Sequence, residues 1–241
     1  MIATILAGFF FIGDSHTVPL VGGADGPGYV EIIDDSIGGV VAVNWYGCGG
    51  GTLGLLDTRQ CSLLPGFLPT LPIGQTYLRD VIGPMVEGHE TVFILLGTND
   101  FTLESTIGTP NTQIFASRLI LVGEYLVNER GVSEVILLVP MDKFDDLPGP
   151  ANPYYLSDEV QFACWFYPWL VCGPNFQDVI SFEHYDPTDG IHPNGAGHEV
   201  MAQEVLNYVP ESSFQANMFI GTLIVILMKC RNSKWELKFA K

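Results

Sequence analysis

Short apolar runs recur along the chain and are separated by longer segments of mixed apolar and polar residues. Each run is rich in β-branched or aromatic residues and is bounded by Gly, Pro or polar residues, as buried strands are. The runs predict five strands, at residues 5–12, 40–45, 92–96, 135–139 and 179–182.

The segments between these runs predict helices at residues 29–36, 75–86, 112–129 and 195–208. In the third segment, Ile114, Leu119, Val122 and Leu126 approximate the spacing of one buried helix face. Alternation of strands and helices indicates βαβ units and a mainly parallel sheet covered on both sides. The predicted fold class is therefore a three-layer α/β/α sandwich.

Residues 141–178 interrupt this alternation. They contain five prolines and a cluster of aromatic residues between two predicted strands. A connection of this length is usually functional or carries short helices of its own. Two interpretations stand side by side: a lid or substrate-binding wall, and a locally packed insertion without a substrate role.

The charge distribution narrows the range of partners. The net charge is −17, which has the wrong sign for binding a phosphate backbone, so nucleic acid is not an expected partner. Five of the ten basic residues lie in the last 13 positions, which suggests an acidic body with a basic tail.

The first 15 residues lack the charged region and cleavage site of a signal peptide. We therefore expect either a cytoplasmic protein or a missing natural amino terminus.

Candidate residues for nucleophilic catalysis lie near the two ends of the predicted domain. Ser15, in Gly-Asp-Ser, follows the first predicted strand, where a serine can project from the start of a helix. Asp189 and His192 lie three residues apart on a loop rich in Pro and Gly, just before the last predicted helix. A serine hydroxyl needs a base to take its proton, and that base needs a carboxylate to hold its tautomer. Ser15, His192 and Asp189 can supply these three roles.

Donors for a tetrahedral oxyanion are expected on the same sheet edge. The glycine run GCGGGT follows the second predicted strand, and Gly97-Thr98-Asn99-Asp100 follows the third. A glycine turn can aim a backbone N–H, and Asn99 can aim its side-chain amide. Taken singly, the first segment is a tight turn and the second a helix cap. Their common placement at strand ends favours a functional reading.

The segments FIGDSHT, GCGGGT, LLGTNDF and DGIHPNGAGH together resemble the four sequence blocks of the SGNH (GDSL-type) hydrolases, in the family's order. The resemblance spans about residues 5–208 and implies the flavodoxin-like SGNH hydrolase fold. It also implies Ser15 as nucleophile, His192 as general base and Asp189 as its orienting acid. The oxyanion donors would be the Ser15 N–H, Gly50 and Asn99, with Gly49 and Gly51 as alternatives to Gly50.

Other residues depart from the family pattern or argue against other classes of enzyme. His16 stands where the family more often has leucine, and a residue at this place generally points away from substrate. The Gly-x-Ser-x-Gly elbow of α/β-hydrolases is absent around Ser15. The remaining histidines lack zinc-ligand spacing, so we expect neither a metal nor another cofactor. His184 is expected to be a structural side chain on the last strand, and His198 lies in the following helix.

Five cysteines leave the redox compartment open. Cys164 and Cys172 bracket an aromatic stretch, and Cys48 and Cys61 flank the glycine run and the segment that follows it. Both pairs suit disulfides in an exported protein, and both equally suit buried free thiols. Cys230 would remain unpaired in the disulfide reading.

We expect a domain at residues 1–209 and a tail at residues 210–241, after the last predicted helix. Val209-Pro210-Glu211 precedes an uncharged run at 218–228 and the basic end, an order similar to PEP-CTERM sorting segments. Eleven residues of helix cover only about 16 Å, which is short of a bilayer core of about 30 Å. The alternatives are a membrane-attaching tail of an exported or cell-surface protein, a surface helix packed on the domain, and an unstructured terminus.

The expected function is hydrolysis of carboxylic esters through an acyl-enzyme, as in an esterase or lipase. The substrate would be a small-molecule, lipid or glycan ester, and the acidic body disfavours anionic ones. The enzymatic alternative is a carbohydrate O-deacetylase or acyltransferase of the same fold. The non-enzymatic alternative is a surface-anchored binding module.

Overall fold

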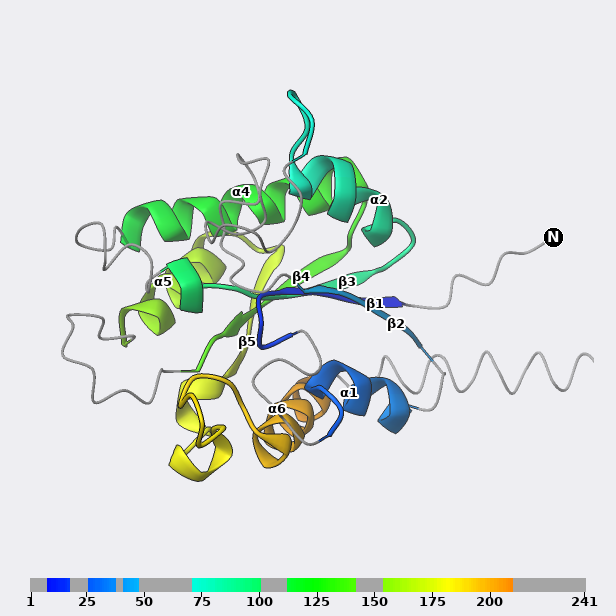
Figure 1. Ribbon diagram of the computed structural model, residues 1–241. Coiled ribbons are helices and arrows are strands. Elements are labelled where there is room, and N and C mark those ends of the chain that lie inside the picture. Colours follow the sequence, from blue (N-terminus) through cyan, green and yellow to red (C-terminus); the bar gives the residue numbers. More distant parts are fainter. Residues whose placement is uncertain are drawn as a thin grey trace, which may run out of the picture.

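A computed structural model describes residues 8–17, 26–37, 41–47, 71–100, 112–141 and 154–209. In these residues five parallel strands form one sheet in the order β2-β1-β3-β4-β5 (Figure 1). The strands are β1 (Gly8–Gly13), β2 (Ala42–Gly47), β3 (Thr91–Leu95), β4 (Glu134–Val139) and β5 (Leu170–Asn175). The carboxyl ends of β1, β2 and β3 are in register, since Gly13 pairs with both Gly47 and Leu95.

Helices cover both faces of this sheet (Figure 1). On one face, α1 (Tyr29–Ile37) packs against α6 (Gly195–Tyr208). On the other lie the π-helix η2 (Tyr77–Ile82) and the α-helices α2 (Gly83–Val86), α4 (Thr112–Arg130) and α5 (Tyr154–Phe166). Two short 3-10 helices, η3 (Phe176–Asp178) and η4 (Phe182–His184), follow β5. The three-layer α/β/α fold predicted from the sequence is confirmed.

The central strand β1 shows why these residues form a buried parallel strand. All six of its residues are buried, and successive side chains point to opposite faces of the sheet. Phe10 and Ile12 contribute to the core beneath η2, α4 and α5. Phe9 and Phe11 contribute to the core beneath α1 and α6, where Phe11 stacks on Phe93 of β3 with ring centroids 4.6 Å apart. The apolar run therefore fills two cores at once.

The first four predicted strands and all four predicted helices are confirmed, with ends shifted by a few residues. The helix predicted at 75–86 changes its hydrogen-bonding pattern along its length, from π at η2 to α at α2. Pro84 lies at the start of α2 and has no backbone N–H to donate to the preceding turn. The π-helical pattern ends directly before this position, where the N–H of Gly83 donates to the carbonyl of Leu78.

The strand predicted at residues 179–182 is wrong. The fifth strand is β5, which lies within the segment interpreted as an insertion at 141–178. Gly173 and Pro174 conceal it in the sequence, because both residues are disfavoured in strands. An edge position tolerates them, and the register with β4 shifts between Leu137 and Val139, opposite this part of β5. Residues 154–175 therefore belong to the main layers, while residues 142–153 lie outside the described part.

Cys164 of α5 and Cys172 of β5 are joined by a disulfide with a Cα–Cα distance of 5.6 Å. Of the two open readings for this pair, the disulfide is the one the structure adopts. It ties the last turns of α5 to the edge strand, and it fits an oxidising compartment. Cys48, Cys61 and Cys230 lie outside the described residues, as does the tail at 210–241.

Candidate active site

Ser15 lies on a tight turn directly after β1. The N–H of Thr17 donates to the carbonyl of Asp14 at 3.1 Å, which closes the turn. A side chain on Gly13 would overlap that of Thr17, so glycine is required where the strand enters the turn. The expectation that Ser15 begins a helix is wrong, because residues 14–17 form a turn and α1 begins at Tyr29. Ser15 is 9% exposed, which leaves its hydroxyl at the edge of the sheet.

Backbone hydrogen bonds between its own residues stabilise the loop between η4 and α6. The N–H of Asp186 donates to the carbonyl of His192 at 2.8 Å, and the N–H of Gly190 donates to the carbonyl of Asp186 at 2.8 Å. Gly190 has φ +62°, a left-handed conformation that favours glycine. Asn194 caps α6 by accepting from the N–H of Gly197 at 3.0 Å. These contacts fix the backbone on both sides of Asp189 and His192.

The structure brings Ser15, His192 and Asp189 into one hydrogen-bonded chain. His192 Nε2 lies 2.9 Å from Ser15 Oγ, and His192 Nδ1 lies 2.6 Å from Asp189 Oδ2. A carboxylate only accepts hydrogen bonds, so the proton of the neutral imidazole belongs on Nδ1. Nε2 is then free to accept the proton of Ser15. This is the relation between nucleophile, base and orienting acid that acyl transfer uses.

Asp189 is held as a carboxylate by its neighbours. Partial burial raises its pKa, but hydrogen bonds from the backbone N–H of His192, the His192 ring and the N–H of Ile191 outweigh that effect, and the pKa is lowered. The two backbone amides donate to Oδ1 at 3.0 and 2.8 Å, while Oδ2 is left for the ring. Both oxygens therefore have fixed partners, and the ring orientation of His192 follows from them.

The expected oxyanion donors are only partly described. Residues 98–100 are helical and follow β3, which neighbours β1, so Asn99 comes from the strand end beside Ser15. The Asn99 side-chain amide donates to Asp14 Oδ2 at 3.4 Å, one residue from the nucleophile. Gly50 lies outside the described residues, as do Gly49 and Gly51. The geometry thus places one of the two expected non-serine donors near the turn.

Three polar residues lie behind the turn; from the sequence, His16 and His198 have no expected role in the site, and Asp14 is not singled out. Asp14 and His16 are fully buried, and so is His198 of α6. His198 Nδ1 accepts from the backbone N–H of Tyr29 at 3.3 Å, and burial is the largest cause that lowers its pKa to about 4. Asp14 had a signal, its place beside Ser15, whereas nothing in the sequence distinguishes His198 from an exposed helical histidine. His184 lies on η4, where its ring accepts from the N–H of Ser181 at 3.0 Å, and the expectation of a strand position is wrong.

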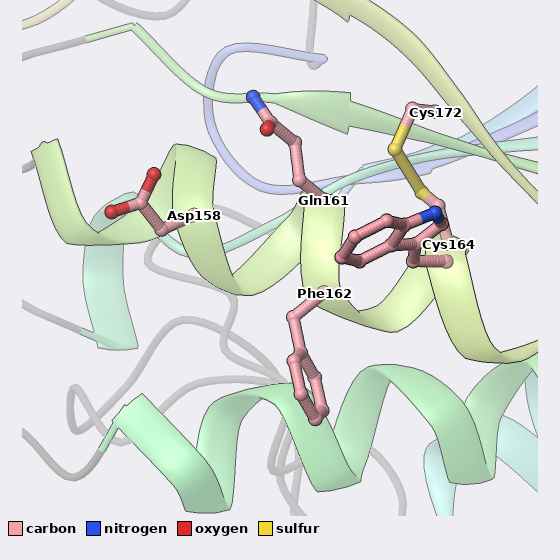
Figure 2. A pocket seen from close by; sticks show the side chains of 6 residues that line it. Asp158, Gln161, Phe162, Cys164 and Cys172 are labelled. Carbon is pink, nitrogen blue, oxygen red and sulfur yellow. A yellow bond between two sulfur atoms is a disulfide. The ribbon is translucent and has the colours of Figure 1, made fainter.

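A separate hollow lies on the outer side of α5 and β5. Its volume is about 550 Å³, and Figure 2 shows its lining side chains, Asp158, Gln161, Phe162, Cys164, Trp165 and Cys172. We call it the α5 groove. None of its lining residues comes from the turn or the loop that carry the candidate triad. The α5 groove and the candidate triad therefore lie in different parts of this molecule.

Two further features concern the described residues alone. Within them, no three His, Cys, Asp or Glu side chains gather in a way suited to a metal ion. No helix in that part of the chain is long and apolar enough to cross a bilayer.

Neither a family model nor a curated protein matches the chain, whereas solved structures do. An acetyl xylan esterase from Geobacillus stearothermophilus aligns at 17% identity over 85% of this chain and 96% of that one, with a TM-score of 0.58. A second acetyl xylan esterase aligns at 16% identity over 84% and 100%, with a TM-score of 0.60. A lipase/acylhydrolase from Enterococcus faecalis aligns at 19% over 83% and 94%, with a TM-score of 0.58. The chain therefore has the α/β fold found in SGNH and GDSL-like esterases and lipases.

Proposed function

We propose that this protein is a serine hydrolase of the SGNH (GDSL-type) family that cleaves carboxylic esters through an acyl-enzyme. The observation that carries the proposal is the hydrogen-bonded chain from Ser15 Oγ through the His192 ring to Asp189. Three residue types with complementary roles converge here from segments about 175 positions apart in the sequence. The fold of known esterases supports the proposal independently.

In the acylation step, Ser15 Oγ attacks the ester carbonyl carbon while His192 Nε2 takes the hydroxyl proton. The carbonyl oxygen becomes an oxyanion, which the Ser15 N–H, Gly50 and the Asn99 amide stabilise in this proposal. His192 then gives its proton to the leaving alkoxide, and an alcohol departs. In deacylation, His192 takes a proton from water while the water oxygen attacks the carbonyl carbon of the acyl-serine. The bond between that carbon and Ser15 Oγ then breaks as His192 returns the proton to Oγ, and the acid and free Ser15 are formed.

The proposed substrates are uncharged esters of small molecules, lipids or glycans. The acidic body disfavours anionic esters, and the same charge disfavours nucleic acid as a partner. O-deacetylation of a carbohydrate is the second candidate. It is favoured by one observation, that two of the solved structures with this fold are named acetyl xylan esterases.

A panel of p-nitrophenyl esters from acetate to palmitate, together with an acetylated xylo-oligosaccharide, tests the proposal. We expect turnover of at least one ester, and none with Ser15→Ala, whose fold should be unchanged because the hydroxyl packs at the edge of the core. Release of acetate from the oligosaccharide alone would favour the deacetylase. No turnover of any ester by a folded wild-type protein would favour the binding module instead.

We also propose that residues 210–241 attach the protein to a membrane as a sorting tail. The proposal rests on the order of Val209-Pro210-Glu211, the apolar run and the basic end, and the disulfide is consistent with export. Truncation after Val209 should move the protein from the membrane fraction to the soluble fraction of its native host. The kcat/KM for a soluble ester should be unchanged, because every proposed catalytic group precedes Pro210. A full-length protein that is already soluble without detergent would contradict the anchor.

A further inference from the structure

A second aspartate–histidine pair lies beneath the candidate triad, on the same turn as Ser15. Asp14 is 0% exposed and His16 is 1% exposed. His16 Nδ1 lies 3.1 Å from Asp14 Oδ1, and His16 Nε2 lies 3.2 Å from the carbonyl oxygen of Ile191. The ring is thus held between the turn that carries the nucleophile and the loop that carries the base.

The partners of His16 define its protonation state. The Ile191 carbonyl can only accept a hydrogen bond, so Nε2 must carry a proton. Asp14 accepts on both oxygens, from the backbone N–H of His16 at 3.0 Å and from the Asn99 amide at 3.4 Å, as an ionised carboxylate does. His16 Nδ1 lies 3.1 Å from Asp14 Oδ1, within ion-pair distance for a protonated ring. An imidazolium at His16 would form an ion pair with this carboxylate, the arrangement that makes two buried charges tolerable.

Other side chains also lie near this ring. Thr98 Oγ1 lies 3.4 Å from Nδ1, and its hydroxyl can accept from a protonated Nδ1. Among the described residues, the titratable neighbours of this ring besides Asp14 include His192, whose ring centroid is 5.5 Å away, and His198. Burial lowers the pKa of His198, and electrostatic interactions with the rings of His16 and His192 lower it further. A neutral His198 and a charged His16 can therefore coexist behind the site.

Ile191 connects His16 to the candidate triad. This residue lies between Asp189 and His192 in the sequence, and its N–H donates to Asp189 Oδ1 at 2.8 Å. Its carbonyl accepts from His16 on the opposite side of the same residue. Movement of the Ile191 backbone would shift the carboxylate and the base together, and a misplacement of about 1 Å can cost about 10²-fold in rate.

We propose that His16 is a positioning residue that, as an imidazolium held by Asp14, fixes the Ile191 backbone and thereby aligns Asp189 and His192 on Ser15. The proposal rests on the proposed ester hydrolase for its kinetic consequences. It does not make His16 a catalytic residue, since the ring is buried and the polar contact that the proposal uses goes to the backbone of the loop. A histidine at this place supplies one donor to each segment, which a leucine does not.

Two matched variants separate the contacts of the ring. In His16→Gln the side-chain amide extends to the region of Nε2 and can still donate to the Ile191 carbonyl. In His16→Asn the shorter amide corresponds to Nδ1 and retains only the contact with Asp14. We expect His16→Asn to lower kcat by about 10²-fold with KM unchanged, and His16→Gln to retain most of the wild-type kcat. Equal losses in both variants, or a loss confined to KM, would overturn the positioning role.

Proton NMR gives a readout that does not depend on turnover. The proton in the 2.6 Å contact between His192 Nδ1 and Asp189 should resonate far downfield, because short hydrogen bonds deshield their protons. The signal should persist in His16→Gln and broaden or vanish in His16→Asn. A signal unchanged in a folded His16→Asn protein would overturn the proposal, even if the wild type hydrolysed no ester and the proposed function had failed.

A measurement on the wild type covers the case in which His16→Asn does not fold. Nitrogen-15 spectra of the histidine rings, assigned through the backbone, report which ring nitrogens carry protons. At pH 7.5, a mildly basic value chosen for the experiment, we expect both nitrogens of His16 to be protonated. A His16 ring with one unprotonated nitrogen would overturn the imidazolium pair and the proposal with it.

Discussion

Two regions of the molecule differ in the side chains that they bring together. One is the carboxyl-end edge of the sheet, which carries Ser15, and the other is the α5 groove. At the edge, three side chains from two distant segments meet within hydrogen-bonding distance. The α5 groove is spacious and aromatic, and Trp165 in it is 89% exposed. Its neighbouring disulfide joins α5 to β5 and contributes to stability. The comparison teaches that the candidate chemistry of this protein lies where polar groups converge and not at the α5 groove.

The largest expected effect concerns the base. His192→Gln keeps the size of the side chain and its polarity but removes the group that takes the proton of Ser15. We expect kcat on the best ester to fall by a factor on the order of 10⁶, as loss of the base does in a well-studied serine protease. The urea midpoint should stay the same, because His192 is a loop residue rather than part of a core. An active His192→Gln protein would break the contrast between the two regions.

The next effect concerns the oxyanion. Asn99→Ala should lower kcat by about 10²–10³, because one donor to the developing charge is lost, and should leave KM nearly unchanged. Steady-state kinetics on the same ester separate the two constants. If KM rises while kcat stays constant, Asn99 binds the substrate in its ground state and is not an oxyanion donor.

On the groove side, the double variant Cys164→Ser/Cys172→Ser should change stability and leave catalysis alone. The bridged cysteines are 8 positions apart, and the chain-entropy model gives about 2–3 kcal/mol for a loop of this size. Urea titration measures the change, and kcat/KM on a soluble ester should match the wild type. A large loss of activity in the folded double variant would show that the groove takes part in the reaction.

The smallest expected effect concerns His198 and acid pH. Its pKa is lowered from 6.5 to about 4 in the folded protein, so the unfolded chain binds the extra proton first as the pH falls. The stability that neutral His198 contributes is complete above about pH 6.5 and is lost progressively towards pH 4. Between pH 7 and pH 5 the loss amounts to about 2 kcal/mol.

The control for this prediction is His198→Asn, whose side-chain oxygen can still accept from the Tyr29 N–H but does not titrate. Urea midpoints of both proteins at the two pH values isolate the contribution of His198. The wild type should lose more stability than the variant over this interval. Identical losses in the two proteins would contradict the lowered pKa.

The same two regions show which parts of the structure could be predicted from the sequence. The buried strands and amphipathic helices follow from local patterns, and the polar residues at strand ends predict that Ser15, Asp189 and His192 meet. The edge strand β5 does not follow, because Gly173 and Pro174 break the local pattern and only its pairing with β4 reveals it. The role of His16 also depends on tertiary contact, since its partner Ile191 is 175 positions away.

The central claim is that Ser15 is a nucleophile activated by His192, and covalent labelling with a fluorophosphonate tests it most directly. Mass spectrometry of the digested protein should find a single phosphonylated serine, in the peptide that contains Ser15. Labelling should be absent in Ser15→Ala and slowed severely in His192→Gln, while the disulfide double variant should react at the wild-type rate. Modification of another serine, or labelling of Ser15 at equal rates with and without His192, would contradict the account.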